Sequence, residues 1–236
     1  TIYENILQAK AKNEKLLAVL IDPEKVTLET AFVLSEKIKN SPATHVFVGG
    51  STFSGSHLNE LIAVLKEKTQ LPVLIFPGNP YQISDEADGI LFLSLLSGRN
   101  PEYLIEHQIN AVRILEQTRL EVIPTAYLLV DGGKETAVQI VSQTKPIAYN
   151  DIELAYKTAK AGEFLGMKLI YLEAGSGANQ NVSIEMINYI ATNCKIPVIV
   201  GGGIRSMQTA QRIYDSGADL VVIGTAFEND SNFFKE

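Results

Sequence analysis

The sequence predicts an α/β protein folded as one closed (β/α)8 barrel. Eight short apolar segments read as buried strands along the 236 residues, and amphipathic helical patterns lie between most of them. Strands that alternate with helices indicate a parallel sheet, and eight of them in a chain of this length favour a barrel over an open doubly wound sheet. The first strand is also not followed by the glycine pattern of a dinucleotide-binding sheet.

The expected elements follow in chain order, beginning with an entry helix at residues 3–11. Strands are expected at residues 16–21, 45–49, 73–76, 89–93, 122–129, 168–173, 198–200 and 220–223. Helices are expected at residues 28–39, 58–69, 102–117, 152–161, 184–193 and 207–216. We expect a single domain over residues 1–236, because no linker or low-complexity segment divides the chain.

One unit departs from this pattern, between the third and fourth strands. Residues 77–88 carry two prolines, a glycine and an asparagine near their start, and they leave room for barely two helical turns. The third helix of the barrel is therefore expected to be missing or vestigial, which makes this a modified TIM barrel. The apolar strip left uncovered should be occupied by another subunit or by an apolar ligand.

Composition narrows the class of protein. A net charge of −7 without a basic block argues against binding to nucleic acid or to an anionic membrane surface. Cys194 is the only cysteine, so it forms no disulfide within the chain, and we expect it to be a buried, inert thiol. No apolar run approaches the roughly 20 residues needed to span a bilayer. We therefore expect a soluble, cytoplasmic protein.

Two strands near the end of the chain terminate in glycine. The seventh is followed by Gly201, Gly202 and Gly203, and the eighth by Gly224 and Thr225. Glycine lets the backbone approach an anion, and the free N–H groups of a helix N-terminus attract negative charge. In (β/α)8 barrels the loops after strands 7 and 8 often bind phosphate, so we expect a phosphate site here. The alternative is that these glycines only form tight turns.

Polar residues follow the first and second strands. Asp22 ends the first, where it would face the phosphate loops, and Ser51 and Thr52 follow the second. A carboxylate near phosphates is repulsive unless a cation lies between them, so Asp22 and a neighbouring hydroxyl predict a Mg²⁺ site. The alternative readings are an Asp-Pro turn after the first strand and a plain glycine-rich turn after the second.

The sixth strand ends with residues that suit acid–base chemistry. By alternation, Tyr171 and Glu173 share one face of the strand. A carboxylate at an inner strand end should be desolvated and have a raised pKa, which suits a general base. An ion pair across the barrel is the alternative for Glu173. The glycines on either side of Ser176 add a third anion-binding loop.

These strand ends together resemble a known family. The residues are 20–25 (LIDPEK), 48–52 (VGGST), 171–177 (YLEAGSG), 200–205 (VGGGIR) and 223–228 (IGTAFE). The motifs, in this order and over nearly the whole chain, are similar to those of geranylgeranylglyceryl phosphate synthases. Leu20 stands where some archaeal members carry a lysine. The related heptaprenylglyceryl phosphate synthases share most of the motifs, so the length of the prenyl chain stays open.

The resemblance implies a prenyltransferase that joins sn-glycerol 1-phosphate to a prenyl diphosphate, with geranylgeranyl diphosphate as the first choice, on a barrel that lacks its third helix. It implies that Mg²⁺ is bound by Asp22 with Ser51 or Thr52. It implies that glycerol phosphate is held by Tyr171, Leu172, Glu173, Ala174, Gly175, Ser176, Gly177, Gly201, Gly202, Gly203, Gly224 and Thr225. Glu173 would accept the proton of the attacking hydroxyl, and Tyr171 would orient the glycerol.

Two other functions compete with this interpretation. A sugar-phosphate isomerase or lyase would share the phosphate loops but needs a second acid–base partner or a Schiff-base lysine. A non-catalytic binder of phosphorylated metabolites would gain nothing from two carboxylates in its site. For the prenyltransferase we further expect a homo-oligomer and a transient membrane contact on product release. The roles of Lys25, Lys134 and Tyr149 are left open.

Overall fold

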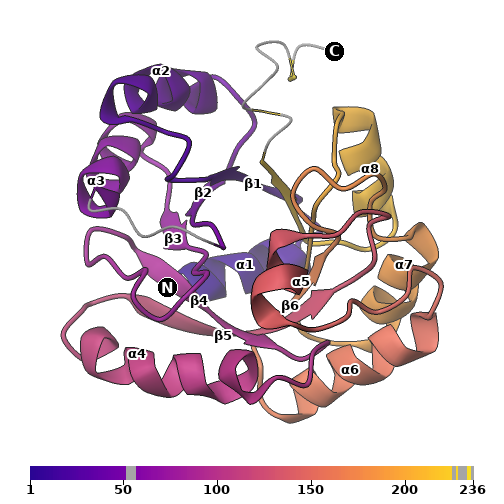
Figure 1. The fold of residues 1–236 in the computed structure, drawn as a ribbon. Helices are drawn as coiled ribbons and strands as arrows, with labels where there is room; N and C mark the ends of the chain where they lie inside the picture. Colours follow the sequence, from indigo (N-terminus) through magenta and orange to yellow (C-terminus); the bar gives the residue numbers. More distant parts are fainter. Residues whose placement is uncertain (52–56, 225–226, 228–232, 235–236) are drawn as a thin grey trace.

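The chain folds as a closed barrel of parallel strands, as the sequence predicts. The computed structural model describes residues 1–51, 57–224, 227, 233 and 234. Within these residues eight strands pair in sequence order, and the ring closes where the last strand pairs with the first. Figure 1 looks along the barrel and shows the helices surrounding the strands. The prediction of a TIM barrel is therefore confirmed.

The strands match the expected segments to within a few residues at their ends. They are β1 (Leu16–Ile21), β2 (His45–Val48), β3 (Val73–Ile75), β4 (Gly89–Leu95), β5 (Glu121–Leu129), β6 (Leu169–Glu173), β7 (Val198–Gly201) and β8 (Leu220–Ile223). The helices are α1 (Ile2–Ala11), α2 (Leu28–Lys39), α3 (Leu58–Thr69), α4 (His107–Leu115), α5 (Ala137–Ser142), α6 (Ile152–Phe164), α7 (Ile184–Asn193) and α8 (Met207–Asp215), with a π-helical turn, η1 (Glu102–Glu106), before α4.

No helix of the described chain lies between β3 and β4, which confirms the missing third helix. Residues 76–88 run as turns from one strand to the next. The prolines explain this, since each lacks an N–H donor and restricts the residue before it. In Figure 1 the outer ring of helices is accordingly open between α3 and α4.

Two helical features were not predicted from the sequence. The short helix α5 begins after Thr136, whose hydroxyl accepts a hydrogen bond from the N–H of Gln139, and it ends at Gln143 in the left-handed conformation. Its six residues are too few to show a helical period. The expected helix at 102–117 instead begins with the π turn η1 and continues as α4. Such turns occur often at functional sites.

Alternation along the strands sorts their side chains between two apolar clusters. Leu169 and Tyr171 of β6 belong to the cluster inside the barrel, together with Phe47 and Leu74. The intervening Leu172 packs in the outer cluster, between the barrel and its helices. The interior is therefore filled by side chains, as in other barrels of this size. Any ligand must bind at an end of the barrel.

Helix α1 covers the end of the barrel where the strands begin. Its Ile6 belongs to the interior cluster. The N–H groups of Ile2 and Tyr3 donate hydrogen bonds to the Glu121 carboxylate at the start of β5. At the other end of the helix, Lys10 forms an ion pair with Asp219, with 2.8 Å between Nζ and Oδ2. Because these contacts block one end, the opposite end is the one available to a ligand.

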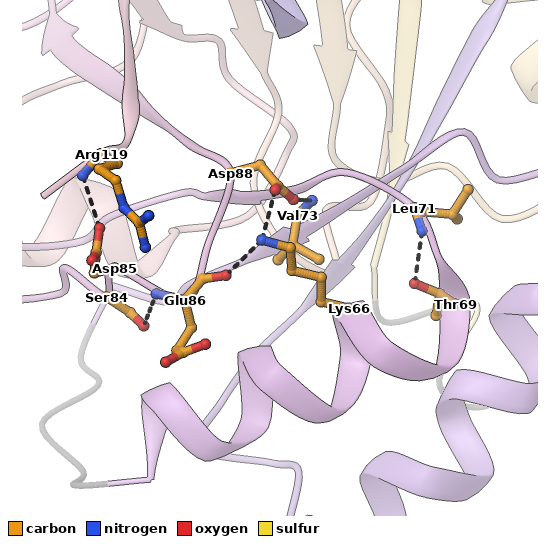
Figure 2. Close-up of polar contacts among 9 residues, drawn as sticks. All are labelled: Lys66, Thr69, Leu71, Val73, Ser84, Asp85, Glu86, Asp88 and Arg119. Carbon is orange, nitrogen blue, oxygen red and sulfur yellow. Dashed lines mark hydrogen bonds and ion pairs between the residues drawn. The ribbon is translucent and has the colours of Figure 1, made fainter.

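A repeated arrangement joins neighbouring strands at this covered end. Asp219, just before β8, accepts a hydrogen bond from the first N–H of β7, that of Val198 (2.9 Å). Asp88, just before β4, accepts one from the first N–H of β3, that of Val73 (2.9 Å), and pairs with Lys66. Figure 2 shows this second arrangement. Each aspartate thus satisfies a backbone donor that the ladder leaves unpaired.

No helix in the described part of the chain is both long enough and apolar enough to cross a membrane.

Replacing Asp219 should destabilise the barrel more than replacing an exposed aspartate. Asp219→Ala leaves the Val198 N–H and the Lys10 ammonium without their partner, which should cost about 2–4 kcal/mol. Asp215→Ala removes a carboxylate whose one hydrogen bond within the described residues comes from exposed Gln211, and should stay within about 0.5 kcal/mol of wild type. Urea unfolding of both variants measures the difference. Equal unfolding midpoints would contradict the role assigned to Asp219.

Candidate active site

A polar cavity opens at the end of the barrel where the strands finish. It is formed by the loops after β1, β2, β6, β7 and β8. Of the predicted site residues, it is lined by Asp22, Ser51, Tyr171, Glu173, Gly175, Ser176, Gly177, Gly202, Gly203 and Gly224. Closure of the barrel therefore brings together residues that lie as far apart in sequence as Asp22 and Gly224.

The remaining predicted residues lie around this cavity or outside the described chain. Leu172 and Ala174 alternate with the cavity residues and pack in the outer apolar cluster, so only their backbone is available to a ligand. Gly201 ends β7 beneath the cavity. Thr52 and Thr225 lie outside the described residues.

Glu173 is a buried carboxylate at the end of β6. Only 6% of the residue is exposed, and its Oε1 accepts a hydrogen bond of 2.6 Å from the N–H of Gly175. Burial raises its pKa to about 7, although the Gly175 N–H and the nearby Tyr171 hydroxyl both act to lower it. Near neutral pH this carboxyl group can therefore both accept and release a proton.

The loop after β7 accommodates only glycine at the positions that contact the Glu173 carboxylate. Gly202 has φ of +89°, and a Cβ there would lie 2.5 Å from Oε1 of Glu173. A Cβ on Gly201 would lie 2.9 Å from the other carboxylate oxygen, Oε2. The close approach leaves no room for a side chain between the loop and Glu173. The backbone of this loop is thus exposed to the cavity instead.

Tyr171 lies beside Glu173 on the inner face of β6. Its ring stacks on Phe76 with 5.2 Å between centroids and meets Tyr127 edge-on at 5.5 Å. Burial, followed by the charge of Glu173, raises the pKa of Tyr171 well above its ordinary value, so the hydroxyl stays protonated. Its oxygen has no hydrogen-bond partner of acceptable geometry among the described residues. A buried hydroxyl without a partner, next to a cavity, is suited to bind a polar ligand.

Asp22 lies across the cavity, after β1. Its carboxylate accepts a hydrogen bond from the N–H of Glu24 and is 3.3 Å from the ammonium of Lys25. A Cβ on Gly50 would lie 2.9 Å from its Oδ1, so the loop after β2 packs directly on it. Ser51 lies next in that loop and lines the same cavity.

This donor set fits Mg²⁺ only if the substrate supplies most of the ligands. In the described chain no three His, Cys, Asp or Glu side chains are grouped as metal ligands. Asp22 and Ser51 instead offer one carboxylate and one hydroxyl. Mg²⁺ bound to phosphorylated substrates commonly uses one or two carboxylates and completes its octahedron with phosphate oxygens and water. The residues present are consistent with that kind of binding.

An apolar groove continues from the cavity toward the missing helix. It shares Gly50, Ser51, Phe76, Tyr127 and Val138 with the polar cavity. Its walls are residues 77–80 of the segment after β3, together with β4, η1, α4 and α5. One end of the groove therefore opens beside Asp22 and Tyr171, and the rest is lined mainly by hydrocarbon. The sequence predicted the uncovered strip but not these walls, because η1 leaves no signal in the helical pattern.

Three further polar residues differ in their relation to the cavity. Lys25 lines it and pairs with Asp22. Lys134 is exposed, but its Nζ would be 3.9 Å from a Cβ placed on Gly177, so its ammonium lies above the loop after β6. Tyr149 is exposed and does not line the cavity. Phe76 and Tyr127 are site residues that sequence reasoning missed, since each reads as an ordinary core aromatic.

Comparisons with known proteins agree with this geometry. The family model described as "PcrB family" matches residues 9–236. The geranylgeranylglyceryl phosphate synthase of Flavobacterium johnsoniae is 58% identical to the chain, and the match covers 99% of this chain and 96% of that protein. The enzyme of the same name from Zunongwangia profunda is 54% identical, over 97% of both.

Solved structures give the same result. A crystal structure of (S)-3-O-geranylgeranylglyceryl phosphate synthase from Thermoplasma acidophilum, in complex with its substrate sn-glycerol-1-phosphate, superposes with a TM-score of 0.94. It is 36% identical, and the match covers 100% of this chain and 94% of that one. Thiamine phosphate pyrophosphorylase from Pyrococcus furiosus, at 15% identity and a TM-score of 0.59, shares the fold alone. With a family model that matches nearly its whole length and relatives more than half identical to it, the chain belongs to the PcrB family.

Proposed function

We propose that this protein is a prenyltransferase that joins sn-glycerol 1-phosphate to a prenyl diphosphate, with geranylgeranyl diphosphate as the donor. The observation that carries the proposal is the meeting of a polar, glycine-lined cavity and an apolar groove beside Glu173. The chemistry of the first suits a small phosphate ester, and the hydrocarbon lining of the second suits an apolar chain. The names of the relatives and the glycerol phosphate bound in the Thermoplasma structure support the same reaction.

The glycine loops after β6, β7 and β8 would bind the glycerol phosphate. Gly175, Gly177, Gly202 and Gly203 all have positive φ, which turns the chain sharply and leaves backbone near the ligand. Such turns form concave sites for anions through their N–H groups. Tyr171 would donate its unpartnered hydroxyl to the glycerol and so hold it above Glu173.

Glu173 would act as the general base. The C–O bond between the prenyl group and diphosphate breaks, and the C1 carbon becomes an allylic cation. The glycerol 3-hydroxyl forms the new ether bond to C1 and loses its proton to Glu173, while diphosphate leaves. Because burial holds the pKa of Glu173 near 7, the carboxylate is basic enough to take this proton at neutral pH.

Asp22 with Ser51 or Thr52 would hold Mg²⁺ beside the diphosphate. When bound, the ion supplies positive charge that stabilises the leaving diphosphate. Lys25 lies within reach of the same anion, since its ammonium already pairs with Asp22. The groove would bind the prenyl chain and shield the cation from water.

The groove favours this reaction over the two competing functions. A sugar-phosphate isomerase or a phosphometabolite binder has no use for an apolar groove that opens beside a buried carboxylate. Heptaprenylglyceryl phosphate synthase activity would use the same groove with a longer donor, and relatives named as geranylgeranyl enzymes favour the shorter one. A homo-oligomer, a transient membrane contact and a cytoplasmic location stay predictions.

The reaction is tested by incubating the protein with Mg²⁺, sn-glycerol 1-phosphate and labelled prenyl diphosphates of increasing length. We expect an ether-linked product with the geranylgeranyl donor. Each added isoprene unit should tighten donor binding several-fold until the groove is filled, because each buried CH₂ contributes at most about 0.8 kcal/mol. Chromatography of the products and competition binding measure both effects. Affinity that ignored chain length would contradict the assignment of the groove.

Glu173→Gln should lower the rate about 10²–10⁴-fold while glycerol phosphate still binds, since the variant keeps the shape of the side chain and loses its basicity. Wild-type activity should fall as the pH drops below about 7, where Glu173 takes up a proton. The raised pKa also means that burying the ionised form opposes folding, and this cost builds up as the pH rises from the ordinary carboxyl pKa of 4.5 to about 7. The variant should therefore gain thermal stability relative to wild type as the pH rises from 5 to 8. A near-normal rate in the variant would rule out Glu173 as the base.

Asp22→Asn should weaken Mg²⁺-dependent binding of prenyl diphosphate and leave the affinity for glycerol phosphate nearly intact, because the two anions contact different loops. Calorimetric titration of each substrate, with and without Mg²⁺, measures the two effects. Wild-type protein titrated in EDTA is the matched control. If the variant lost glycerol phosphate binding instead, the two anion sites would have to be exchanged.

A further inference from the structure

Gln82 lies in the segment that replaces the missing helix, and only 3% of the residue is exposed. Its side-chain oxygen accepts a hydrogen bond of 3.0 Å from the N–H of Gly78. Its side-chain nitrogen donates one of 2.9 Å to the carbonyl oxygen of Gly50. One buried amide therefore joins two loops, each through a backbone group.

The contact between these two loops lies where the two parts of the proposed site meet. Gly78 lines the apolar groove, whereas Gly50 lines both the groove and the polar cavity and packs on the carboxylate of Asp22. They touch so closely that a Cβ on Gly78 would lie 2.3 Å from the carbonyl oxygen of Gly50. A shift of one loop would therefore affect the other, and the Gln82 amide bonds to both at this contact.

We propose that Gln82 is a positioning residue that holds the groove wall in register with the loop that receives the diphosphate. The inference rests on the proposed function. A prenyl diphosphate bound as proposed would contact both loops at once, with its hydrocarbon against residues 77–80 and its charged end beside Asp22 and Ser51. Glycerol phosphate bound by the glycine loops would contact neither residues 77–80 nor Gln82, since none of these lines the polar cavity. A change at Gln82 should therefore affect one substrate and not the other.

The other half of the segment is held independently of Gln82. Lys66 donates a hydrogen bond to the carbonyl of Glu86 and forms an ion pair of 2.7 Å with Asp88. The carboxylate of Asp85 accepts a hydrogen bond from the N–H of Arg119 (2.8 Å). Figure 2 shows these contacts, which attach the segment to α3 and to the start of β5. The fold of residues 84–88 should therefore survive a change at Gln82.

The test compares Gln82→Met with Lys66→Met, which loosens the same segment at its far end. Calorimetry measures the affinity for a non-reactive geranylgeranyl thiodiphosphate with Mg²⁺, and separately for glycerol 1-phosphate. Gln82→Met leaves two buried backbone groups without partners and should weaken binding of the thiodiphosphate about tenfold or more, with less than about twofold change for glycerol phosphate. Lys66→Met should lower the melting temperature and leave both affinities unchanged.

A second variant uses pH to separate positioning from general loss of structure. In Gln82→Glu, the neutral carboxyl can still accept from Gly78 and donate to Gly50, but the ionised form has no donor and adds charge near Asp22 and Lys25. We compare the affinity of this variant for the thiodiphosphate with that of wild type at each pH. The ratio of the two affinities should approach one at acid pH and fall as the pH rises. If Gln82→Met does not fold, this variant still tests the proposal.

Three results would overturn the inference. Equal losses for both substrates would mean that Gln82 is only structural. Unchanged thiodiphosphate binding in both Gln82 variants would mean that Gln82 does not position the groove wall relative to the loop after β2. Wild-type protein that bound no prenyl thiodiphosphate would overturn the proposed function itself, and the inference with it.

Discussion

The closed ladder of parallel strands is the constraint on which the rest of the structure depends. Residues of β1 pair with β8 as well as with β2, so no strand of the barrel is left with an open edge. Because all strands run the same way, their carboxyl ends meet at one rim. Helix α1 covers the other rim and is bonded there to the starts of β5 and β8. The barrel is therefore open at one end only, and every loop that carries polar residues for the site begins there.

That rim has to bind two anions around a carboxylate. The glycine loops meet this need with backbone N–H groups, which attract an anion without bringing a formal charge next to Glu173. Burial makes Glu173 a suitable base, because a carboxylate with a raised pKa is a stronger base than an exposed one. Asp22 and Lys25 come from the loop after β1 and Glu173 from the end of β6, so different strands supply the charges for the second anion and the base.

The missing helix links the two halves of the site. A helix after β3 would cover the strip where the apolar groove now lies. In its place the chain runs through turns whose far half is attached by ionic contacts, and the Gln82 amide bonds the near half to the loop after β2. The loss of a standard element therefore creates a hydrocarbon site, and a small number of side chains keep its wall in place.

The sequence by itself determined the barrel and the identity of most cavity residues. Short apolar runs, helical periods and glycines at strand ends are local signals, and the prolines of residues 77–80 excluded a helix without any reference to the rest of the chain. Asp22, Glu173 and the glycine loops followed from the rule that strand ends meet at one rim. The short helix α5 and the turn η1 were not predicted, since neither is long or regular enough to show a helical period in the sequence.

Only the tertiary structure decided how these residues act on one another. The pKa of Glu173 depends on burial by residues from other strands, and the stacking of Phe76 on Tyr171 joins β3 to β6 across the barrel. Gln82 reads in the sequence as one polar residue in a loop, and its importance appears only when Gly50 and Gly78 are seen to touch. Contacts of this kind join residues far apart in the chain, so no local pattern encodes them; they exist only once the barrel has closed.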